Sequence, residues 1–548
     1  MLPGSVEWPA EFADRYRREG YWLGTGLGEL LRPWARTDPS RTAVVSGARR
    51  HSYAELDAWA DRLAAGLSAL GLGPGDRVVL QLPNSPEFVA VCVALFRIGV
   101  VPVLALPAHR RNEITYLCAH TEAKAYVAVD TYHRFDYRSL AREVRAAVPT
   151  LKHVVVAGEA EEFIALADLA TAQRPAREER ASASSAQVPA AVTAPDPGEV
   201  AFFLLSGGTT GLPKLIPRTH DDYAYQLRET ASAMGFDERG VYLACLPIAH
   251  NAALGCPGVL GALWAGGRVV LAGSPSPDEV FPLIAREGVT LTTLMPSFLK
   301  LWSEMAPVLE ADLSGLVVEV GGARLSPQDA ALVGPALGCT LTRWFGMAEG
   351  VLSFTRLDDS EDVRVTTEGH PLSPADEFRV VDEDDRDVAP GQEGQLLVRG
   401  PCTLRGYYRA PEYNARTFTE DGFLRTGDLV RRTPEGRLVV TGRMRDVVNR
   451  AGEKVPAEEV EGFLAAHPRV RDAAVVGLPD PVLGERTCAV VVPEGQPPTL
   501  AEVREFLIGQ GLAEYKLPDR VETSSVLPRT TLGKLDKRAL RAALAQPG

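Results

Sequence analysis

A segment rich in glycine and hydroxyl side chains, with a single lysine, follows an apolar stretch in the first half of the chain. It reads SGGTTGLPK and spans residues 206–214. Glycines let a loop bend sharply and turn its backbone N–H groups toward an anion, and the ammonium of Lys214 adds a charge suited to phosphate. The segment lacks the Gly-Lys-Ser/Thr spacing of a Walker loop. It therefore predicts a phosphate-binding loop of another kind, with a solvated Gly/Thr turn as the alternative.

Predicted strands and helices alternate ahead of this segment and must position it. A helix over 53–71 precedes apolar strands at 77–82, 100–106, 125–129 and 153–158. This alternation is typical of an α/β domain with a largely parallel sheet. The apolar run VAFFLL leads directly into the glycine-rich segment, so we expect the loop to follow a strand.

The sequence pattern changes twice along the chain. The Ala-, Pro- and Ser-rich stretch 171–199 predicts a flexible surface linker. From Gly394 onward, short segments such as QLLVRG and GRLVVTGR predict antiparallel strands, and the residues after Arg443 suffice for a small α+β domain. Because a chain of 548 residues exceeds the size of one core, we expect two domains, 1–442 and 443–548.

Composition excludes several classes of protein. The net charge of −13 argues against a nucleic-acid-binding protein, although an acidic docking surface stays open as an explanation. Seven scattered cysteines without a C-x-x-C pair exclude a zinc ribbon and suit a reducing compartment. We find neither a signal peptide nor an apolar run of the ~18 residues that a membrane helix needs. A cytoplasmic protein with no nucleic-acid or membrane partner is expected.

Six motifs, in order along the chain, resemble those of the adenylate-forming superfamily of acyl- and aryl-CoA synthetases, adenylation domains and luciferases. They are SGGTTGLPK (206–214), VGGARLS (320–326), WFGMAEG (344–350), TGDL (426–429), GRMRDVVNRAGEKV (442–455) and LPRTTLGKLDKRAL (527–540). VEWPAEFADRYRREGYW, LPIAHN and GLAEYKLPDRVE further resemble the stand-alone aryl-acid-activating branch, which includes 2,3-dihydroxybenzoate–AMP and salicylate–AMP ligases. The resemblance implies a large N-terminal domain of parallel-sheet α/β subdomains and a small β-barrel-like subdomain, followed by a small mobile α+β domain.

The resemblance also implies ATP and Mg²⁺ as cofactors and assigns residues to them. Asp428 would accept hydrogen bonds from the ribose hydroxyls, with Arg443 nearby. Glu349 and Thr210 would bind the metal ion. The phosphates would be held by Ser206, Gly207, Gly208, Thr209, Thr210, Gly211 and Lys214, and the adenine would be flanked by Gly322, Ala323, Phe345, Gly346 and Met347.

The implied catalytic residues are Lys534, His250 and Glu349. Lys534 resembles the lysine that reaches the reacting carboxylate and the α-phosphate, and His250 would line the carboxylate end of the acid. Arg445 resembles the hinge about which the small domain rotates, and residues 452–454 would face the thiol channel in the second conformation. A hinge is expected because one lysine cannot stay over the phosphates while a thiol enters from that side.

The acid pocket is assigned by the same resemblance. Asn251 would hydrogen-bond the ortho-hydroxyl of a salicyl-type ring, and Cys256 replaces the serine of dihydroxybenzoate-activating relatives. A thiol is a poor partner for a second ring hydroxyl, which favours a salicylate-type acid. The pocket residues are His250, Asn251, Ala252, Cys256, Gly321 and Trp344.

The identity of the acid and its acceptor stays open at this point. Ala252 and Trp344 depart from the usual tyrosine and valine, so the pocket is reshaped, and dihydroxybenzoate or an amino-hydroxybenzoate are alternative acids. The expected acceptor is the phosphopantetheine thiol of a separate aryl carrier protein, since no carrier domain is found in the chain. An aryl-CoA ligase and, in a different class, a non-catalytic nucleotide-binding scaffold are the rival interpretations.

Overall fold

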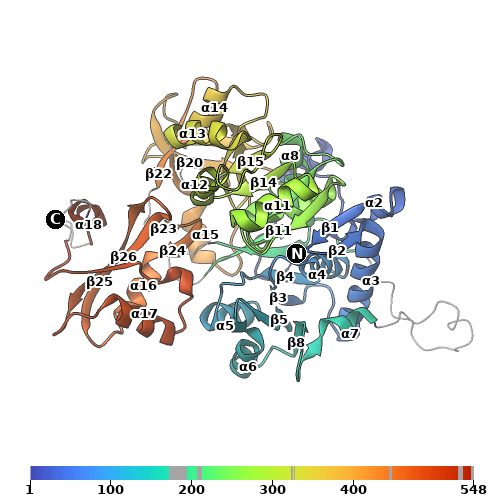
Figure 1. Cartoon of the computed structure of the whole chain (residues 1–548), viewed down its shortest axis with the longest axis horizontal. Helices are drawn as coiled ribbons and strands as arrows, with labels where there is room; N and C mark the ends of the chain where they lie inside the picture. The colour runs from blue at the N-terminus through green and yellow to red at the C-terminus, as the bar shows by residue number, and fades with distance from the viewer. Residues whose placement is uncertain are drawn as a thin grey trace, which may run out of the picture.

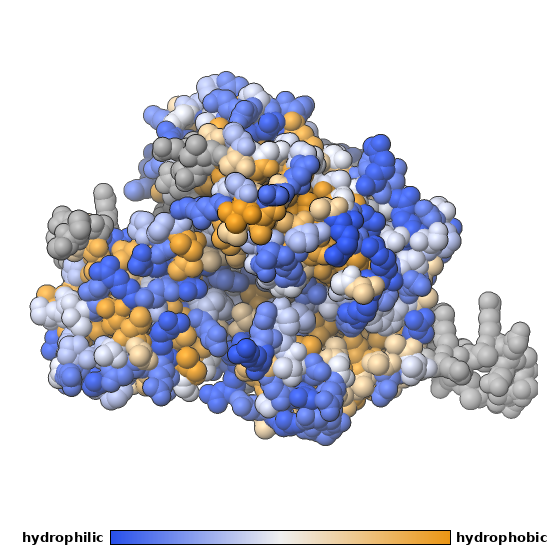
Figure 2. Space-filling model, viewed as in Figure 1, coloured by the Kyte–Doolittle hydropathy of each residue, from blue (hydrophilic) through white to orange (hydrophobic). Residues whose placement is uncertain are grey.

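The computed structural model describes residues 2–171, 194–206, 213–322, 325, 327–443, 447–528 and 535–544. These residues form a large N-terminal domain and a small C-terminal domain, and Figure 1 shows the small domain in orange and red at the left. Hydrophilic residues cover most of the face seen in Figure 2, with apolar residues grouped between them. Within the described ranges, no helix is both long and apolar enough to span a membrane.

A seven-stranded sheet carries the glycine-rich segment at one edge. Its central strands are parallel, as predicted, and β10 runs parallel to β4 and antiparallel to β11. In spatial order the strands are β11 (Leu215–Thr219), β10 (Val200–Leu205), β4 (Val101–Leu104), β3 (Arg77–Gln81), β5 (Ala125–Val129), β8 (His153–Ala157) and β9 (Ile164–Ala165). The short hairpin β6 (Thr131–Tyr132) and β7 (Phe135–Asp136) lies outside this sheet.

A nine-stranded sheet carries the VGGARLS and WFGMAEG motifs at the carboxyl ends of β15 and β16. Six neighbouring strands are parallel, and antiparallel strands close both edges. In order they are β18 (His370–Pro371), β17 (Val351–Phe354), β16 (Thr340–Met347), β15 (Val317–Val320), β14 (Leu291–Leu294), β12 (Val241–Ala244), β13 (Arg268–Leu271), β1 (Thr42–Ser46) and β2 (Arg49–Ser52).

Helices of the large domain fill the space between these sheets and cover their outer faces. The predicted helix forms α3 (Tyr53–Ala69), whose start is fixed by a capping box between Ser52 and Glu55. In α4 (Pro86–Arg97) every residue except Glu87 is buried, as expected for a helix that is apolar all round. The others are α1 (Ala10–Arg18), α2 (Arg32–Thr37), α5 (Arg111–His120), α6 (Tyr137–Ala147), α7 (Leu166–Thr171), α8 (His220–Ala233), α9 (Asn251–Gly255), α10 (Gly258–Trp264), α11 (Pro277–Glu287), α12 (Pro296–Met305), α13 (Pro327–Leu337), α14 (Glu361–Thr366) and α15 (Pro411–Thr417).

Two further sheets complete the fold, and their strands agree with the sequence pattern. The first is antiparallel, with β19 (Glu377–Val381), β20 (Glu393–Arg399), β21 (Leu424–Arg432) and β22 (Leu438–Arg443). The second belongs to the small domain, with β24 (Glu453–Pro456), β23 (Val447–Arg450), β26 (Gly484–Pro493), β25 (Val470–Asp480) and β27 (Arg520–Thr523). The helices of the small domain are α16 (Ala457–Leu464), α17 (Leu500–Gly509), the short η3 (Glu514–Lys516) and α18 (Lys537–Leu544). Most of the stretch 171–199, residues 172–193, lies outside the described residues.

One buried acid lies in the middle of the nine-stranded sheet. Glu319 on β15 is fully buried, and its Oε2 accepts a hydrogen bond from Thr293 Oγ1 at 2.8 Å. Within the part of the chain that the structure describes, its Oε1 has no hydrogen-bonding partner. Burial raises the pKa of Glu319 to about 8 because removal from water disfavours the charged carboxylate.

We predict that Glu319→Gln makes the protein less sensitive to rising pH. The folded pKa of about 8 lies above the ordinary value of 4.5, so folding takes up a proton between these pH values. The free energy of unfolding of the native protein therefore falls as pH rises through this window, by on the order of 3 kcal/mol at neutral pH. The neutral amide escapes this loss, and thermal unfolding midpoints measured across the window should diverge in favour of the variant.

The matched control is Glu304→Gln, which removes an exposed acid from α12. It should track the native protein at every pH. Parallel pH profiles for the native protein and Glu319→Gln would show that the carboxyl group of Glu319 is ionised in the fold.

Candidate functional site

The glycine-rich segment is the loop of the β10–β11 hairpin. The backbone N–H of Ser206 donates to the carbonyl oxygen of Lys214 at 2.9 Å and closes the loop. The Lys214 ammonium lies 4.1 Å from the ring centroid of Tyr413 on α15. The predicted phosphate-binding residues between them, Gly207, Gly208, Thr209, Thr210 and Gly211, lie outside the described residues.

Glu349 lies in the turn between β16 and β17 and is 5% exposed. Its Oε1 accepts a hydrogen bond from the Tyr407 hydroxyl at 2.8 Å, and its carbonyl oxygen accepts one from the Leu404 N–H at 2.8 Å. The next residue, Gly350, has a φ of +90°, and a Cβ there would overlap the Cys402 carbonyl. A glycine is therefore required for the close approach that brings Tyr407 to Glu349.

Two tyrosines bring Lys214 and Glu349 into one cluster. The rings of Tyr407 and Tyr413 meet edge to face with centroids 5.2 Å apart. Asn414 holds the backbone of Tyr407 by accepting from its N–H and donating to its carbonyl oxygen, each at 2.9 Å. Sequence reasoning missed both tyrosines, although the aromatic-rich stretch YYRAPEYN was a signal that this segment packs against something polar.

The predicted acid-binding residue Asn251 is held by a buried polar network. Its Oδ1 accepts from the Tyr223 hydroxyl at 2.9 Å and from Gln226 Nε2 at 3.0 Å. Its Nδ2 lies 3.6 Å from the sulfur of Cys256, which is fully buried. Gln226 is fixed in turn by Arg218, whose Nη2 donates to Gln226 Oε1 at 3.0 Å. Because both lone pairs of Oδ1 are occupied, the second hydrogen on Nδ2 is the polar group that Asn251 can offer to a ligand.

The charge at the base of this network is paired. Arg218 on β11 is fully buried, and its Nε lies 2.8 Å from Oδ1 of Asp222 in the first turn of α8. Burial lowers the pKa of Arg218, but the neighbouring Asp222 carboxylate outweighs burial and raises it overall. None of Arg218, Asp222, Tyr223 and Gln226 was predicted. Their sequence signal is the polar run RTHDDYAYQ, which spans the end of β11 and the buried first turns of α8.

Trp344 packs against Gly321 of the VGGARLS motif and Gly346 of the WFGMAEG motif. A Cβ on Gly321 would overlap the indole ring, and one on Gly346 would lie 3.1 Å from its Cζ3. Phe345, Gly346 and Met347 continue β16 and are half-buried. Ala252 is buried at the start of α9, and Ala323 lies outside the described residues.

Asp428 and Arg443 occupy directly paired positions on the antiparallel strands β21 and β22. Asp428 is 2% exposed, and its backbone N–H donates to Thr426 Oγ1 at 3.0 Å. The side chain of Arg443, the predicted hinge Arg445 and the predicted catalytic Lys534 lie outside the described residues.

The small domain contacts the large one where the predicted adenine and acid sites meet. Asn449 Nδ2 and Lys454 Nζ each donate to the carbonyl oxygen of Gly322 at 2.9 Å. Glu453 Oε1 lies 3.4 Å from His250 Nε2. Gly452 approaches Met295 so closely that a Cβ would lie 2.7 Å from its Cγ. The 449–454 segment therefore covers Gly322 and His250 in this structure.

The Glu453 carboxylate changes the titration of His250. Burial lowers the pKa of His250, but the nearby carboxylate outweighs burial, and the pKa is raised overall. The effect is reciprocal: burial raises the pKa of Glu453, and the charge of His250 brings it below its usual range. The pair is favoured when the imidazole is protonated.

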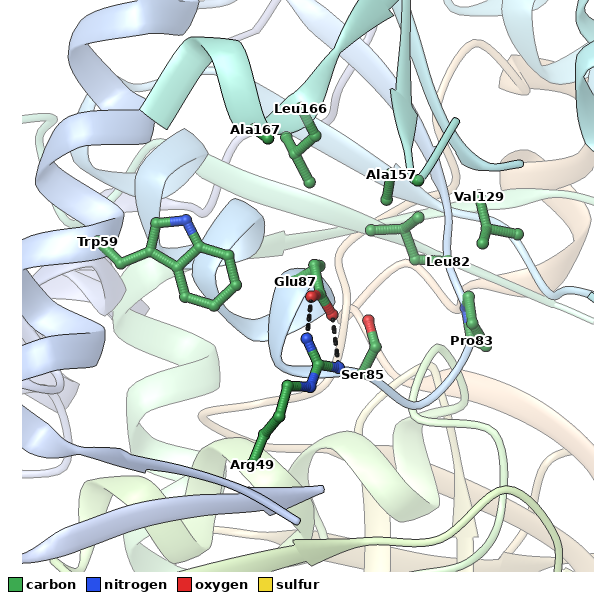
Figure 3. Close-up of a pocket in the computed structure, with 11 residues that line it drawn as sticks. Arg49, Trp59, Leu82, Pro83, Ser85, Glu87, Val129, Ala157, Leu166 and Ala167 are labelled. Carbon is green, nitrogen blue, oxygen red and sulfur yellow. Dashed lines mark hydrogen bonds and ion pairs between the residues drawn. The ribbon is translucent and has the colours of Figure 1, made fainter. Parts of the chain in front are cut away.

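A separate cavity of about 360 Å³ lies in the large domain (Figure 3). The Arg49–Glu87 ion pair, 2.6 Å between Nη1 and Oε1, stands in it, and the Trp59 ring forms one wall. Its lining is completed by Leu82, Pro83, Ser85, Val129, Ala157, Gly158, Leu166 and Ala167. The residues that line this cavity include none of those that the sequence analysis assigned to the nucleotide, the acid or the metal ion.

Comparisons with known proteins agree with this architecture. A family model described as AMP-binding enzyme matches residues 31–408, and one described as AMP-binding enzyme C-terminal domain matches residues 459–534. Triostin synthetase I of Streptomyces triostinicus is 54% identical over 99% of both chains. The 2,3-dihydroxybenzoate-AMP ligase of Bacillus subtilis (strain 168) is 53% identical over 100% of this chain and 98% of its own. The apo structure of Mycobacterium smegmatis MbtA matches with 46% identity and a TM-score of 0.75, covering 99% of each chain.

We predict that Glu453→Gln lowers the pKa of His250. The amide removes the negative charge that favours the imidazolium, while burial of the ring continues to disfavour it. The titration is followed by NMR on protein labelled in its histidine rings, and a His250→Gln sample identifies the resonance.

Glu494→Gln, which neutralises an exposed acid of the small domain, serves as the control and should leave the titration unchanged. An unaltered His250 titration in Glu453→Gln would mean that the two side chains are not paired in solution.

Proposed function

The chain belongs to the AMP-binding enzyme family, and on that premise we propose that it is an ATP-dependent ligase that converts an aryl acid to its aryl-adenylate. The acid is of the salicylate type, with a hydroxyl ortho to the carboxyl group. The observation that carries this choice is the fixed orientation of Asn251, whose amide nitrogen retains a hydrogen to donate beside the buried Cys256. Such a donor matches the oxygen of an ortho-hydroxyl group.

In the first half-reaction an oxygen of the aryl carboxylate attacks the α-phosphorus of ATP. The bond between that phosphorus and the bridging oxygen breaks, and pyrophosphate leaves. The carboxylate is already anionic, so the protein needs to neutralise charge and orient the reactants rather than supply a nucleophile. Lys214 and Lys534 are the cations proposed for this role, at the phosphates and at the reacting carboxylate respectively.

The residues present fit a nucleotide and a hard metal ion. Asp428 is a buried carboxylate, the group that accepts hydrogen bonds from ribose hydroxyls, and the left-handed φ of +74° at Gly322 lets its backbone turn beside the adenine position. Glu349 supplies one carboxylate for Mg²⁺, which binds through one or two carboxylates together with substrate phosphates. In the described ranges no group of three His, Cys, Asp or Glu side chains is placed to hold a metal ion. When bound, Mg²⁺ would neutralise phosphate charge.

Cys256 supports a salicylate-type acid over a dihydroxybenzoate. Its thiol already lies within 3.6 Å of two amide nitrogens, Gln226 Nε2 and Asn251 Nδ2, and burial raises its pKa well above the usual range. A neutral thiol engaged in this way packs well against ring C–H groups but offers little to a second hydroxyl. The dihydroxybenzoate ligase of Bacillus subtilis is a relative of this chain, and dihydroxybenzoate is therefore the rival acid in the test below.

In the second half-reaction a thiol displaces AMP from the aryl-adenylate. We propose the phosphopantetheine arm of a separate aryl carrier protein as the acceptor, and siderophore or other nonribosomal peptide assembly as the setting. We assign the path of the thiol to the border formed by His250, at the N-terminus of α9, and the 449–454 segment, a choice supported by the contact between Glu453 and His250. Transfer to coenzyme A instead would assign the chain to the aryl-CoA ligases.

We predict that the purified protein catalyses exchange between ATP and pyrophosphate that depends on an aryl acid and is led by salicylates. The panel is salicylate, methylsalicylates, 2,3-dihydroxybenzoate, 3-hydroxyanthranilate, benzoate and a fatty acid. Lys534→Ala should lower the rate by at least about a hundredfold, since it removes a charge that acts in the transition state. Exchange led by dihydroxybenzoate would overturn the assignment of the acid, and nucleotide binding without exchange would favour a non-catalytic scaffold.

We predict that Tyr223→Phe weakens binding of acids with an ortho-hydroxyl and leaves benzoate unaffected. The variant removes one of the two donors that hold Asn251 Oδ1, so the amide is free to rotate. Loss of one neutral hydrogen bond is worth about 1 kcal/mol, so KM for salicylate should rise about fivefold with kcat little changed. Tyr225→Phe, on the same helix but bonded to Ser373 and Asp376, is the matched control. Equal changes in KM for salicylate and benzoate would contradict the role of Asn251.

A further inference from the structure

A buried group of three charges joins the two domains. Lys516 of η3 places Nζ 2.8 Å from Oε1 of Glu113 on α5, which belongs to the large domain. The same nitrogen lies 2.9 Å and 2.8 Å from the two carboxylate oxygens of Glu459 on α16, within the small domain. The three side chains are 3%, 1% and 7% exposed for Lys516, Glu113 and Glu459. We refer to Glu113, Lys516 and Glu459 as the charge triad.

The Glu113 end of the triad is fixed by a second hydrogen bond. The Oε2 atom of Glu113 accepts a hydrogen bond from the Arg110 N–H at 3.0 Å, so each oxygen of this carboxylate has a donor. Burial raises the pKa of Glu113, but the charge of Lys516 outweighs it and brings the pKa below its usual range. Charges this deeply buried are tolerated only when they meet their partners in good geometry. The triad therefore fits one orientation of the small domain and penalises small displacements from it.

Neighbouring contacts define the same orientation. Asn112 Nδ2 donates to the carbonyl oxygen of Gln510 at 3.0 Å. Gly511, with a φ of +83°, lies so close that a Cβ would be 2.7 Å from Asn112 Oδ1. The first residues of α5 thus receive the loop between α17 and η3 without room for a side chain at Gly511.

The triad is connected to the segment that covers the site. Glu459 lies in the first turn of α16, and α16 begins directly after β24, the strand that carries Glu453 and Lys454. An ion pair between Lys516 and Glu459 therefore fixes η3 to the element that places Glu453 beside His250 and Lys454 on the Gly322 carbonyl. Anchoring η3 on α5 anchors the 449–454 segment as well.

The same orientation places α18, with Leu527 and Leu535, on the side of the small domain away from α5. Leu527 and Leu535, which flank the 529–534 segment, pack with α18 on one face of the five-stranded sheet. The hydrophobic residues of α16 and α17 pack on the other face, the one whose helices and η3 meet α5. Figure 1 shows α18 at the outer edge of the small domain and β23 and β24 nearer the large domain. A rigid small domain cannot present both faces to the site at once.

We propose that Glu113 and Lys516 are positioning residues for the second half-reaction, holding the small domain with its 449–454 segment over the site while the aryl group is transferred to a thiol. This inference rests on the proposed function. In that step the thiolate sulfur attacks the carbonyl carbon of the aryl-adenylate and a C–S bond forms. The bond from that carbon to the phosphate oxygen breaks, AMP leaves with the electron pair, and the thiol proton passes to solvent. Neither residue touches the reacting atoms.

Glu113→Gln is the sharpest test, because it keeps the acceptor for the Arg110 N–H and leaves Lys516 paired with Glu459. The amide replaces the only carboxylate that the large domain contributes to the triad. Two rates are measured on the full chain: aryl-acid-dependent ATP–pyrophosphate exchange, and single-turnover transfer from preformed aryl-adenylate to pantetheine. We expect transfer to slow at least tenfold while exchange stays within twofold of the native rate or rises. Lys516→Gln, on the other side of the contact, should give the same split.

The matched control is Glu122→Gln, which neutralises an acid of the large domain whose carboxylate accepts hydrogen bonds from Arg409 and Arg77, both in the large domain. It should change neither rate. Equal loss of exchange and transfer in Glu113→Gln would show a general structural role and overturn the inference, as would unchanged transfer. Failure of the proposed function is distinct from both, since it would appear in the native protein as absence of exchange with every aryl acid.

Discussion

The carbonyl oxygen of Gly322 accepts hydrogen bonds from two side chains of the small domain, and the arrangement of the site depends on this contact. Asn449 and Lys454 both donate to it, each at 2.9 Å. Gly322 lies two residues after β15, where the parallel strands of the nine-stranded sheet present their carboxyl ends, the usual place for a ligand in such sheets. The large domain supplies the walls of the site, and the small domain supplies its cover.

A cover made of a separate domain requires that the walls hold their shape without it. The polar network joining β11, α8 and α9 does this for the proposed acid side: the Arg218–Asp222 pair is fully buried, and it is linked through Gln226 to Asn251. Removing one partner from such a network leaves a buried group unpaired, so the network favours a single arrangement. On the side proposed to face the phosphates, the Tyr407 hydroxyl donates to Glu349 and the Tyr413 ring lies against the Lys214 ammonium.

The sequence predicted the local structure well because local structure depends on neighbours. The helix that became α3 carries its own capping box, and the apolar run before the glycine-rich segment became β10. Motif spacing also indicated which residues lie near the ends of strands. It could not indicate Tyr407, whose partner Glu349 is 58 positions away, because nothing in the spacing of either residue refers to the other.

The charge triad shows the same limit more sharply, and it explains why the limit matters for function. Glu113 and Lys516 are 403 positions apart, and each reads in isolation as an ordinary charged residue of a helix or turn. Their burial arises only when the two domains meet, so the information lies in the interface rather than in either segment. In the proposed mechanism the small domain leaves this interface for one half-reaction and returns for the other, which requires contacts that are specific in geometry but weak enough to release. Buried ion pairs meet this requirement. When the domains separate, water hydrates the exposed charges, and this hydration offsets much of the free energy lost with the ion pairs. An apolar interface of the same area would lack that compensation and would hold the small domain in one orientation.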